Sequence, residues 1–425
     1  MPELPPKPQG AYRVIHTADW HLGKTLVDQS REEEHARFLT FLLEAIVAGA
    51  VDALVIAGDV FDSSNPPQSA QARYYGFLSQ LYTTTDCAVV VIAGNHDSPA
   101  QLEAPRQVLQ SLRVRVVGSA TGDPGEALVA LPGLESPRLV VAAVPFLRDR
   151  DVRIGQCGQT AAEIQRDLVA GIRQRYAEVA AAASGAVAAG VPILATGHLT
   201  VAGSTTSDSE REIHVGGLGA VGADIFGGRF AYVALGHLHR PQPAGGRADV
   251  RYAGSPIALS FGEAGDTKEV RLLDFGAGDL VTNVGIPIPP QRQLVQLRTR
   301  RADLEQSLRG FQPAAADLTP WVEVVIEDPV AGENSFERVR GLAEGAPYAV
   351  VSVISLRAAG LRGLGGADRA EDEEDGALES SILENPREVF RVRLEREEGL
   401  DDADREAVTN AFSELLELHH EGAAP

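Results

Sequence analysis

Five segments of this sequence place histidine, aspartate or asparagine directly after an apolar run. The segments are Asp19-x-His21, Asp59-x-x-Asp62, Asn95-His96, His198 and His237-x-His239. They hold five of the ten histidines, and most of them stand beside a glycine. A single histidine after a strand is more often a structural hydrogen-bonding residue than a ligand, and a lone Gly-Asp pair is commonly a turn. The recurrence of one arrangement five times therefore favours a shared site.

The chemistry that these side chains could support follows from their ligand types. Carboxylates, imidazoles and one amide suit Mn²⁺ or Fe²⁺ and tolerate Zn²⁺, and no thiolate is among them. Seven candidate ligands are too many for one metal ion but fit two ions that share a bridging carboxylate. They are Asp19, His21, Asp59, Asn95, His198, His237 and His239. Two metals about 3.5–4 Å apart suit hydrolysis of a phosphate ester, because they activate a water and neutralise charge on the phosphoryl oxygens.

Other residues of these segments have supporting roles in this interpretation. Asp59 is the natural bridging ligand, since a carboxylate offers two oxygens. His96 lies next to a ligand and is free to act on the substrate, either by stabilising developing charge or by protonating the leaving oxygen. Asp62 and Asp97 are expected to orient ligands such as neighbouring imidazoles. His16, inside the first apolar run, is better interpreted as a core histidine or one that supports the ligands.

The elements that must position these residues follow from the apolar runs. Strands are predicted at 13–17, 51–57, 88–93, 138–144, 193–196 and 230–235, and helices at 31–47, 68–82 and 160–183. Alternating strands and helices are the pattern of right-handed βαβ units, which predicts an α/β fold. Because the carboxyl ends of parallel strands meet at one edge, we expect one sheet to bring all five segments together. Strands at 270–275 and 280–286 look antiparallel and complete a sheet.

A second, smaller unit is predicted after residue 286. Pro287, Pro289 and Pro290 interrupt the chain there. The sequence then alternates predicted strands and helices, namely strand 293–297, helix 302–309, strand 321–326, helix 335–343 and strand 348–354. We therefore divide the chain into a domain at 1–286 and a small α/β domain at 291–357.

The C-terminal part of the sequence changes in composition. Residues 358–377 are glycine-rich and acidic, which indicates a solvated linker. In the last segment, 378–425, Val408 and Phe412 belong to an apolar stripe on a short helix predicted at 401–418. A helix joined by a linker has little chain of its own to cover that stripe. A partner surface is the natural hypothesis, and packing on the body of the protein is the alternative.

Bulk composition limits the possible classes of protein. With 425 residues, of which 44% are hydrophobic, the chain can form a large core over two or three domains. No apolar run reaches the roughly 18 residues of a membrane helix, and the proline-rich start lacks the apolar centre of a signal peptide. Two cysteines exclude a disulfide framework. We therefore expect a soluble cytoplasmic protein.

The formal net charge of −21 argues against a nucleic-acid partner, since phosphates bind basic patches. Net charge is a global sum, however, and bound divalent cations would add positive charge locally. Charge alone therefore leaves the substrate open.

The five segments resemble the motifs of calcineurin-like metallophosphoesterases. Longer stretches resemble the SbcD family, the nuclease subunits of bacterial SbcCD complexes, which are related to nucleases that process DNA double-strand breaks. Those stretches are 16–23, 94–98, 196–200, 234–240 and 254–257. The resemblance is dense from residue 12 to residue 275, follows the small domain in outline and returns around 386–390.

The resemblance implies a fold and a role for each matched residue. Residues 1–286 would form a nuclease domain with the α+β sandwich of the calcineurin-like type, followed by a small α/β capping domain and a C-terminal helical tail. His96 would be the catalytic histidine. One metal ion would take Asp19, His21, Asp59 and His239, and the other would take Asp59, Asn95, His198 and His237.

The resemblance also implies partners and a reaction. DNA would be cleaved with two Mn²⁺ ions, by exonuclease action on double-stranded ends and by endonuclease action on single-stranded and hairpin DNA. The capping domain would place the DNA over the metals. The segment 378–425 would dock on the coiled-coil base of an SbcC-type ATPase, within a heterotetramer that holds two nuclease subunits. The complex would serve DNA repair and recombination, away from any membrane.

Three hypotheses about function follow. The first is this DNA nuclease working with an ATPase. The second is a phosphodiesterase for small molecules or nucleotides on the same fold, which needs the same two-metal chemistry but neither the small domain nor the tail. The third is a metal-stabilised scaffold that tethers DNA or its partner without hydrolysis, and the presence of His96 argues against it.

Overall fold

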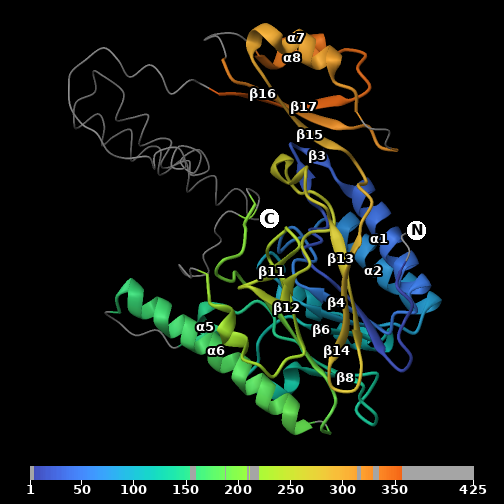
Figure 1. Cartoon of the computed structure of the whole chain (residues 1–425), viewed down its shortest axis with the longest axis vertical. Helices are drawn as coiled ribbons and strands as arrows, with labels where there is room; N and C mark the ends of the chain where they lie inside the picture. Colours follow the sequence, from blue (N-terminus) through green and yellow to red (C-terminus); the bar gives the residue numbers. More distant parts are fainter. Residues whose placement is uncertain are drawn as a thin grey trace. The chain divides into compact units, whose positions relative to one another are not determined.

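The described part of the chain has two β-sheets packed face to face, helices outside them and a third, smaller sheet (Figure 1). The computed structural model describes residues 4–153, 159–186, 188–207, 210, 220–313, 317–328 and 335–356. Within these residues each large sheet has six strands. The predicted acidic linker and the predicted ATPase-docking tail lie outside the described residues.

The first sheet has the strand order β14-β13-β1-β4-β5-β6. Its strands are β1 (Tyr12–Thr17), β4 (Ala53–Ala57), β5 (Ala88–Ile92), β6 (Val114–Val117), β13 (Glu269–Phe275) and β14 (Leu280–Pro287). The pairs from β1 through β6 are parallel, and β13 pairs antiparallel with both β1 and β14. β1, β4 and β5 are strands of the predicted βαβ units, and each ends just before one of the five segments.

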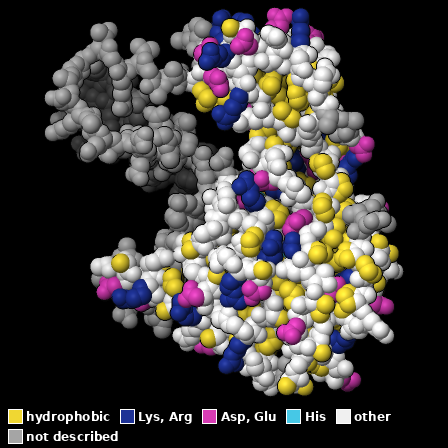
Figure 2. All heavy atoms as spheres, in the orientation of Figure 1, with side chains coloured by type: hydrophobic (Ala, Val, Ile, Leu, Met, Phe, Trp, Pro, Cys, Tyr) yellow, Lys and Arg dark blue, Asp and Glu magenta, His cyan; other side chains and the backbone are white. Residues whose placement is uncertain are grey.

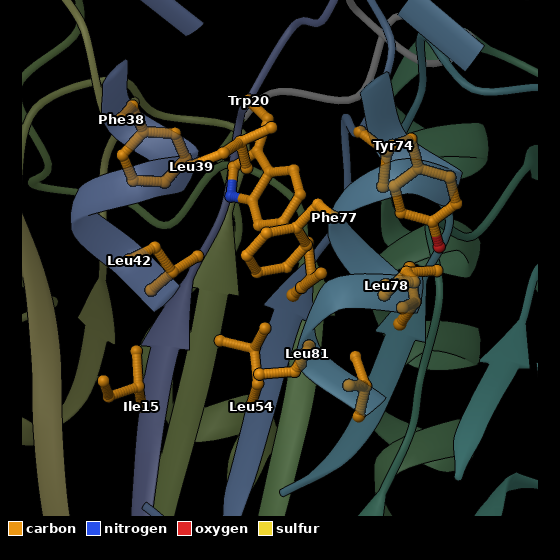
Figure 3. Close-up of a cluster of buried hydrophobic side chains, with 14 of the residues drawn as sticks. Ile15, Trp20, Phe38, Leu39, Leu42, Leu54, Tyr74, Phe77, Leu78 and Leu81 are labelled. Atoms are coloured by element: carbon orange, nitrogen blue, oxygen red, sulfur yellow. The ribbon is translucent and has the colours of Figure 1, made fainter. Parts of the chain in front are cut away.

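Two helices cover the outer face of this sheet, α1 (Glu32–Ala48) after β1 and α2 (Gln68–Thr84) after β4. Their apolar faces pack on strand side chains such as Ile15 and Leu54 (Figure 3). Full burial of one such side chain stabilises the fold by about 1.5–3 kcal/mol. Short elements complete this half of the molecule, namely the β2 (Thr25–Leu26) and β3 (Gln29–Ser30) hairpin, α3 (Pro99–Glu103) and α4 (Arg106–Ser111).

The second sheet has the strand order β11-β12-β10-β9-β8-β7. Its strands are β7 (Leu128–Leu131), β8 (Leu139–Ala142), β9 (Ile193–His198), β10 (Tyr232–Gly236), β11 (Gln242–Ala244) and β12 (Arg247–Tyr252). The central strands β8, β9, β10 and β12 are parallel. The long helix α6 (Ala161–Ala186), preceded by α5 (Asp149–Val152), packs on this sheet through Ile172, Tyr176 and Val179.

The expectation that one sheet carries all five segments is wrong. Asp19, Asp59 and Asn95 follow strands of the first sheet, whereas His198 ends β9 and His237 follows β10 in the second. The central strands of both sheets are buried on two faces, by helices outside and by the other sheet inside. Such strands read as continuous apolar runs, which predict burial but not pairing. The carboxyl ends of β4, β9 and β10 nevertheless lie close together, so the two sheet edges share one site.

The small unit predicted after residue 291 contains a three-stranded parallel sheet with the order β15-β16-β17. Its elements are β15 (Leu294–Thr299), α7 (Leu304–Gly310), β16 (Trp321–Ile326), α8 (Ser335–Leu342) and β17 (Ala349–Ser355). This alternation is the one predicted from the sequence. The two helices lie on one face of the sheet (Figure 1), where Leu304, Val324 and Val339 belong to a separate apolar cluster.

Trp321, at the start of β16, joins the small unit to α1, one of the helices on the first sheet. The guanidinium of Arg31 lies 5.6 Å from the centroid of its ring, and that of Arg292 lies 4.2 Å away. Nε of Arg31 and Nε of Arg292 both donate to Oε1 of Glu34, at 2.7 and 2.9 Å. Because Arg31 and Glu34 belong to the start of α1, cation–π contacts and charged hydrogen bonds hold the small unit against this helix.

Among the described helices, none combines the length and the hydrophobicity that crossing a membrane requires.

Candidate metal centre

Four of the predicted site residues adopt left-handed backbone conformations. The φ angles are 53° at Asp19, 46° at His21, 50° at Asp59 and 100° at His237. Residues other than glycine rarely take positive φ, and those that do cluster at functional sites, where the surrounding structure holds them. All four lie in turns that follow site strands.

Trp20 anchors the first of these turns. Its side chain is fully buried and packs edge-on against Phe38 of α1 and Phe77 of α2, with ring centroids 5.7 and 5.6 Å away (Figure 3). The two ligand candidates on either side of it donate their backbone N–H groups to the carbonyls of Gly58 and Asp59, each at 3.0 Å. Packing of the outer helices therefore fixes the first turn, and main-chain hydrogen bonds fasten it to the second.

The carboxylate of Asp59 is the centre of the cluster. Its Oδ2 lies 3.2 Å from Nε2 of His198 and 3.6 Å from Nε2 of His21, and its Oδ1 accepts the backbone N–H of His96 at 2.9 Å. A Cβ on Gly94 would lie 2.1 Å from this Oδ1, so only glycine fits beside the carboxylate. Asp59 belongs to two groups of three residues, and within each group the potential ligand atoms lie within 4.8 Å of one another. They are His21–Asp59–His96 and Asp19–Asp59–His198.

Burial and charge act in opposition on the ionisable groups of this cluster. Burial would raise the pKa of Asp59, but the adjacent His198 holds that pKa well below its ordinary value. Burial would lower the pKa of His198, whereas Asp59 and then Asp19 raise it to about 9. Burial raises the pKa of Asp19 well above its ordinary value, although His198 opposes this. The site therefore gathers two fully buried carboxyl groups, an arrangement that bound cations stabilise.

Two buried atoms of predicted ligands have no hydrogen-bond partner among the described residues, namely Oδ2 of Asp19 and Nε2 of His21. Oδ1 of the same aspartate accepts the backbone N–H of His237 at 2.8 Å. A buried polar atom without a partner costs about 1–3 kcal/mol. A carboxylate oxygen and an imidazole nitrogen are ligands that divalent metals take, so the residues present fit such ions.

Asn95 links the predicted ligands of the two sheets. Its Oδ1 lies 3.0 Å from Nε2 of His198 and 3.1 Å from Nδ1 of His237. Nδ1 of His198 lies 2.9 Å from the carbonyl oxygen of Ala57 and donates to it, so Nε2 faces the site. All seven predicted ligands thus meet at one place, with His239 in ring contact with His21 at 5.1 Å.

The two aspartates predicted to orient ligands make different contacts. Oδ1 of Asp62 lies 3.2 Å from Nδ1 of His21, so this carboxylate contacts an imidazole directly. Asp97 contacts the main chain instead and accepts backbone N–H groups of Gly94, Phe61 and Val60 at 2.9, 3.0 and 3.2 Å. Burial, and after it the charge of Asp59, raises the pKa of Asp97 to about 6. Asp97 therefore ties the second turn to the third.

His96 is only partly buried, unlike most of the cluster. Its Nδ1 lies 2.8 Å from the carbonyl oxygen of Asp62 and must donate to it, because a carbonyl only accepts. Its ring lies edge-on to that of His21, with centroids 4.9 Å apart. His96 can therefore hold or release a proton at Nε2 beside the ligands.

His16 is a core residue, which is one of the two roles that the sequence suggested for it. The side chain is fully buried, with Nδ1 3.2 Å from Oη of Tyr232 and Nε2 3.2 Å from the carbonyl oxygen of Leu235. Both ring nitrogens thus bind to strand β10, and His16 connects the two sheets beneath the site.

Sequence reasoning misses the charged groups behind His239. Nδ1 of His239 lies 3.2 Å from Oε1 of Glu263, and Oε2 of the same glutamate accepts a hydrogen bond from Lys268. The backbone N–H of His239 donates to Glu210. All of these charged side chains are buried. A glutamate and a lysine five positions apart, between a Gly-Ser-Pro turn and an apolar strand, are the local signal that could have identified them.

Comparisons with known proteins agree with this arrangement. The calcineurin-like phosphoesterase family model matches residues 12–241, and the SbcD_C model, described as the type 5 capsule protein repressor C-terminal domain, matches residues 290–398. The SbcD subunit of nuclease SbcCD from Escherichia coli K12 is 36% identical over 409 residues, which cover 95% of this chain and 98% of that protein.

Two more relatives carry the same name. The protein of Rhodobacter capsulatus is 42% identical over 289 residues, covering 65% of this chain and 70% of its own. The protein of Bacillus subtilis is 34% identical over 337 residues, covering 79% and 83%. The chain described here therefore belongs to the calcineurin-like phosphoesterases and, among them, to the SbcD family of SbcCD nuclease subunits.

Proposed function

We propose that this protein is a metal-dependent nuclease that hydrolyses phosphodiester bonds of DNA at a centre of two divalent ions. The observation that carries the proposal is the position of Asp59, shared by two groups of ligand atoms. The unpaired buried atoms of Asp19 and His21 support it, because they are ligand atoms without another partner among the described residues.

The proposed ligands divide around Asp59. One ion is held by Asp19, His21, Asp59 and His239, and the other by Asp59, Asn95, His198 and His237. Two bound divalent ions supply a hydroxide at neutral pH and neutralise charge on the phosphoryl oxygens. Mn²⁺ is the ion we propose, since the ligands are oxygen and imidazole nitrogen atoms without thiolate.

His96 is the proposed catalytic residue. Because its Nδ1 donates to the Asp62 carbonyl, its Nε2 is the atom that can face the phosphodiester. There it stabilises charge on the phosphoryl group or gives a proton to the leaving oxygen. Its partial exposure, together with that of Asn95, leaves a route by which a substrate can approach from solvent.

DNA is the proposed substrate because relatives that match 95% and 79% of this chain are named nucleases. On the face shown in Figure 2, lysine and arginine side chains are interspersed with aspartate and glutamate rather than gathered in one basic area. With a net charge of −21, this protein relies on the metal centre, the small unit and a partner to hold the phosphate backbone.

The partner that we propose is a coiled-coil ATPase of the SbcC type, bound through residues 378–425 in the cytoplasm. The name of the relatives, which places them in a complex called SbcCD, supports such a partner, and two copies of the nuclease chain within the complex are part of the proposal. Deleting residues 378–425 should abolish binding to the ATPase and leave metal-dependent cleavage of single-stranded DNA. Normal binding by the truncated protein would contradict this docking site.

The test of the function is cleavage of linear duplex DNA, hairpin DNA and single-stranded DNA beside bis-p-nitrophenyl phosphate, with and without the ATPase. We expect cleavage of all four substrates, loss on chelation, and recovery with Mn²⁺. Cleavage of the small phosphodiester alone, even with the ATPase present, would favour a small-molecule phosphodiesterase. No cleavage of any substrate by the Mn²⁺-loaded protein would favour a scaffold.

A further inference from the structure

We propose that Glu263, held in place by Lys268, positions His239 for metal binding by fixing the proton on Nδ1 and leaving Nε2 to the ion. The inference rests on the proposed function, in which His239 is a metal ligand. Glu263 is a positioning residue here, because it contacts the ligand and not the ion or the substrate.

The contact between the two side chains determines the histidine tautomer. Oε1 of Glu263 lies 3.2 Å from Nδ1 of His239. A carboxylate only accepts, so Nδ1 carries the proton, and the lone pair of the neutral ring is then on Nε2. Metal-bound histidines commonly donate their second N–H to a carboxylate in this way, which fixes the ring and raises its basicity.

The carboxylate itself cannot turn easily. Glu263 is fully buried, and its Oε2 accepts from Nζ of Lys268 at 2.7 Å and from the backbone N–H of Leu259 at 3.1 Å. Rotation would break these hydrogen bonds in a site with little access to water. Oε1 is therefore held toward His239.

Lys268 acts on the main chain of the same histidine. Its Nζ donates to the carbonyl oxygen of His239 at 3.0 Å and to Oγ of Ser255 at 3.0 Å, in addition to Glu263. These contacts use the three donors of an ammonium group. One buried ion pair thus fixes both the backbone of His239, through the lysine, and its ring, through the glutamate.

The same arrangement recurs at the other histidine of the same proposed ion. Oδ1 of Asp62 lies 3.2 Å from Nδ1 of His21, as Glu263 does from His239. At the second proposed ion, by contrast, Nδ1 of His198 donates to the carbonyl of Ala57. Loss of the Glu263 charge should therefore weaken binding of the ion that His21 and His239 share and leave binding of the other ion unchanged.

The experiment uses the full-length protein with Glu263→Gln, which keeps the size of the side chain and removes its charge. Asp266→Asn is the matched control, because it makes the same change on the same loop in a carboxylate that pairs with Arg240 instead. Calorimetric titration with Mn²⁺ measures the affinity of the protein for each of the two ions. In E263Q we expect 10–100-fold weaker binding of one ion and unchanged binding of the second. In D266N we expect unchanged binding of both ions.

The outcomes separate this inference from the function on which it rests. If the wild-type protein binds fewer than two Mn²⁺ ions, the proposed two-metal function fails. If the wild type binds two ions and E263Q weakens both equally or neither, the role of Glu263 is wrong.

A second measurement on the wild type holds even if E263Q does not fold. Imidazole ¹⁵N shifts of the metal-free protein, assigned by comparison with His239→Asn, report the tautomer of His239. A proton on Nδ1 supports the inference, and a proton on Nε2 overturns it.

Discussion

The amide oxygen of Asn95 lies 3.0 Å from Nε2 of His198, across the boundary between the two large sheets. Asn95 follows β5 of the first sheet, and His198 ends β9 of the second. Neither sheet alone carries the complete set of predicted ligands. The centre therefore exists only once the sandwich has packed.

Replacing Asn95 by alanine should remove one of the two proposed metal ions. The variant loses an oxygen ligand and the contact that aligns His198, so we expect binding of that ion to weaken by at least about 100-fold, beyond the effect of an outer-shell change. Metal content after dialysis against Mn²⁺ checks this. Asn65→Ala, an exposed asparagine in the loop before α2, is the control. Two tightly bound ions in N95A would show that Asn95 is not a ligand.

His96→Ala should keep both metals and lose most activity. General acid–base catalysis typically contributes about 10²–10⁴-fold, so kcat for DNA cleavage should fall by that factor. Metal content measured on the same sample separates this role from ligation, since His96 also lies within reach of the ligand atoms of His21 and Asp59. Full activity would refute the catalytic role, and loss of one metal would make His96 a ligand.

Gly94→Ala should destroy the centre, because the new Cβ would lie 2.1 Å from Oδ1 and 2.4 Å from the backbone nitrogen of Asp59. The backbone there cannot move without breaking the turn. Gly76→Ala is the control, since no atom lies within 4 Å of its Cβ and it is inside α2. G76A should raise the free energy of unfolding by up to about 1 kcal/mol. Thermal melting and Mn²⁺ binding test both, and wild-type metal affinity in G94A would be inconsistent with the observed packing.

Buried His16 should make the fold sensitive to acid. Burial lowers the pKa of His16 to about 3, against 6.5 for the ordinary side chain. Between these values the unfolded chain binds a proton that the folded chain does not, so stability falls as the pH drops below about 6.5. The contribution approaches about 3 kcal/mol near pH 4. Urea unfolding of His16→Gln should show a smaller loss between pH 6.5 and 4, and an unchanged slope would contradict this.

Trp321→Ala should loosen the small unit. Trp321 is 7% exposed, and its ring contacts the guanidinium groups of Arg31 and Arg292. Truncation of a buried tryptophan costs about 3–5 kcal/mol. Faster proteolysis around residues 287–293 is the expected result. If the small unit places DNA, cleavage of DNA should fall more than cleavage of bis-p-nitrophenyl phosphate. Trp321→Phe keeps an aromatic face and should be milder, so equal effects of the two variants would argue against the cation–π contacts.

The sequence predicts the strands of the site well because each is a continuous apolar run. The observed β1, β4, β5, β9 and β10 lie at or within a few residues of their predicted positions. The assignment of these strands to two sheets could not be predicted. An apolar run records burial on both faces, and an outer helix and a facing sheet bury a strand equally well. Pairing also joins strands that lie far apart in the sequence, such as β1 and the antiparallel β13, which is more than 250 positions away.

The candidate ligands could be predicted because each carries its own local signal, a polar side chain at the end of an apolar strand. The spacing of Glu263 and Lys268 before an apolar strand is a weaker signal, because it does not indicate the contact with His239, which lies 24 positions from Glu263 in the chain. Asp97 shows the same limit. Its place directly after the third segment indicated a role beside the ligands, but only the structure shows that it binds three backbone N–H groups rather than an imidazole.

The left-handed backbone at Asp19, His21, Asp59 and His237 lowers the stability of the metal-free fold, while the side chains at these positions serve the proposed function. Glycine takes such φ angles freely, whereas in other residues they cost about 1–2 kcal/mol each. A library selected only for heat resistance of the metal-free chain should therefore gain glycines at these four positions. Each gain would delete a proposed ligand. A stability map of all single substitutions should thus mark these four positions, like Val27, Asp28, Ala50 and Arg113, as places where glycine would fit the backbone better than the residue present.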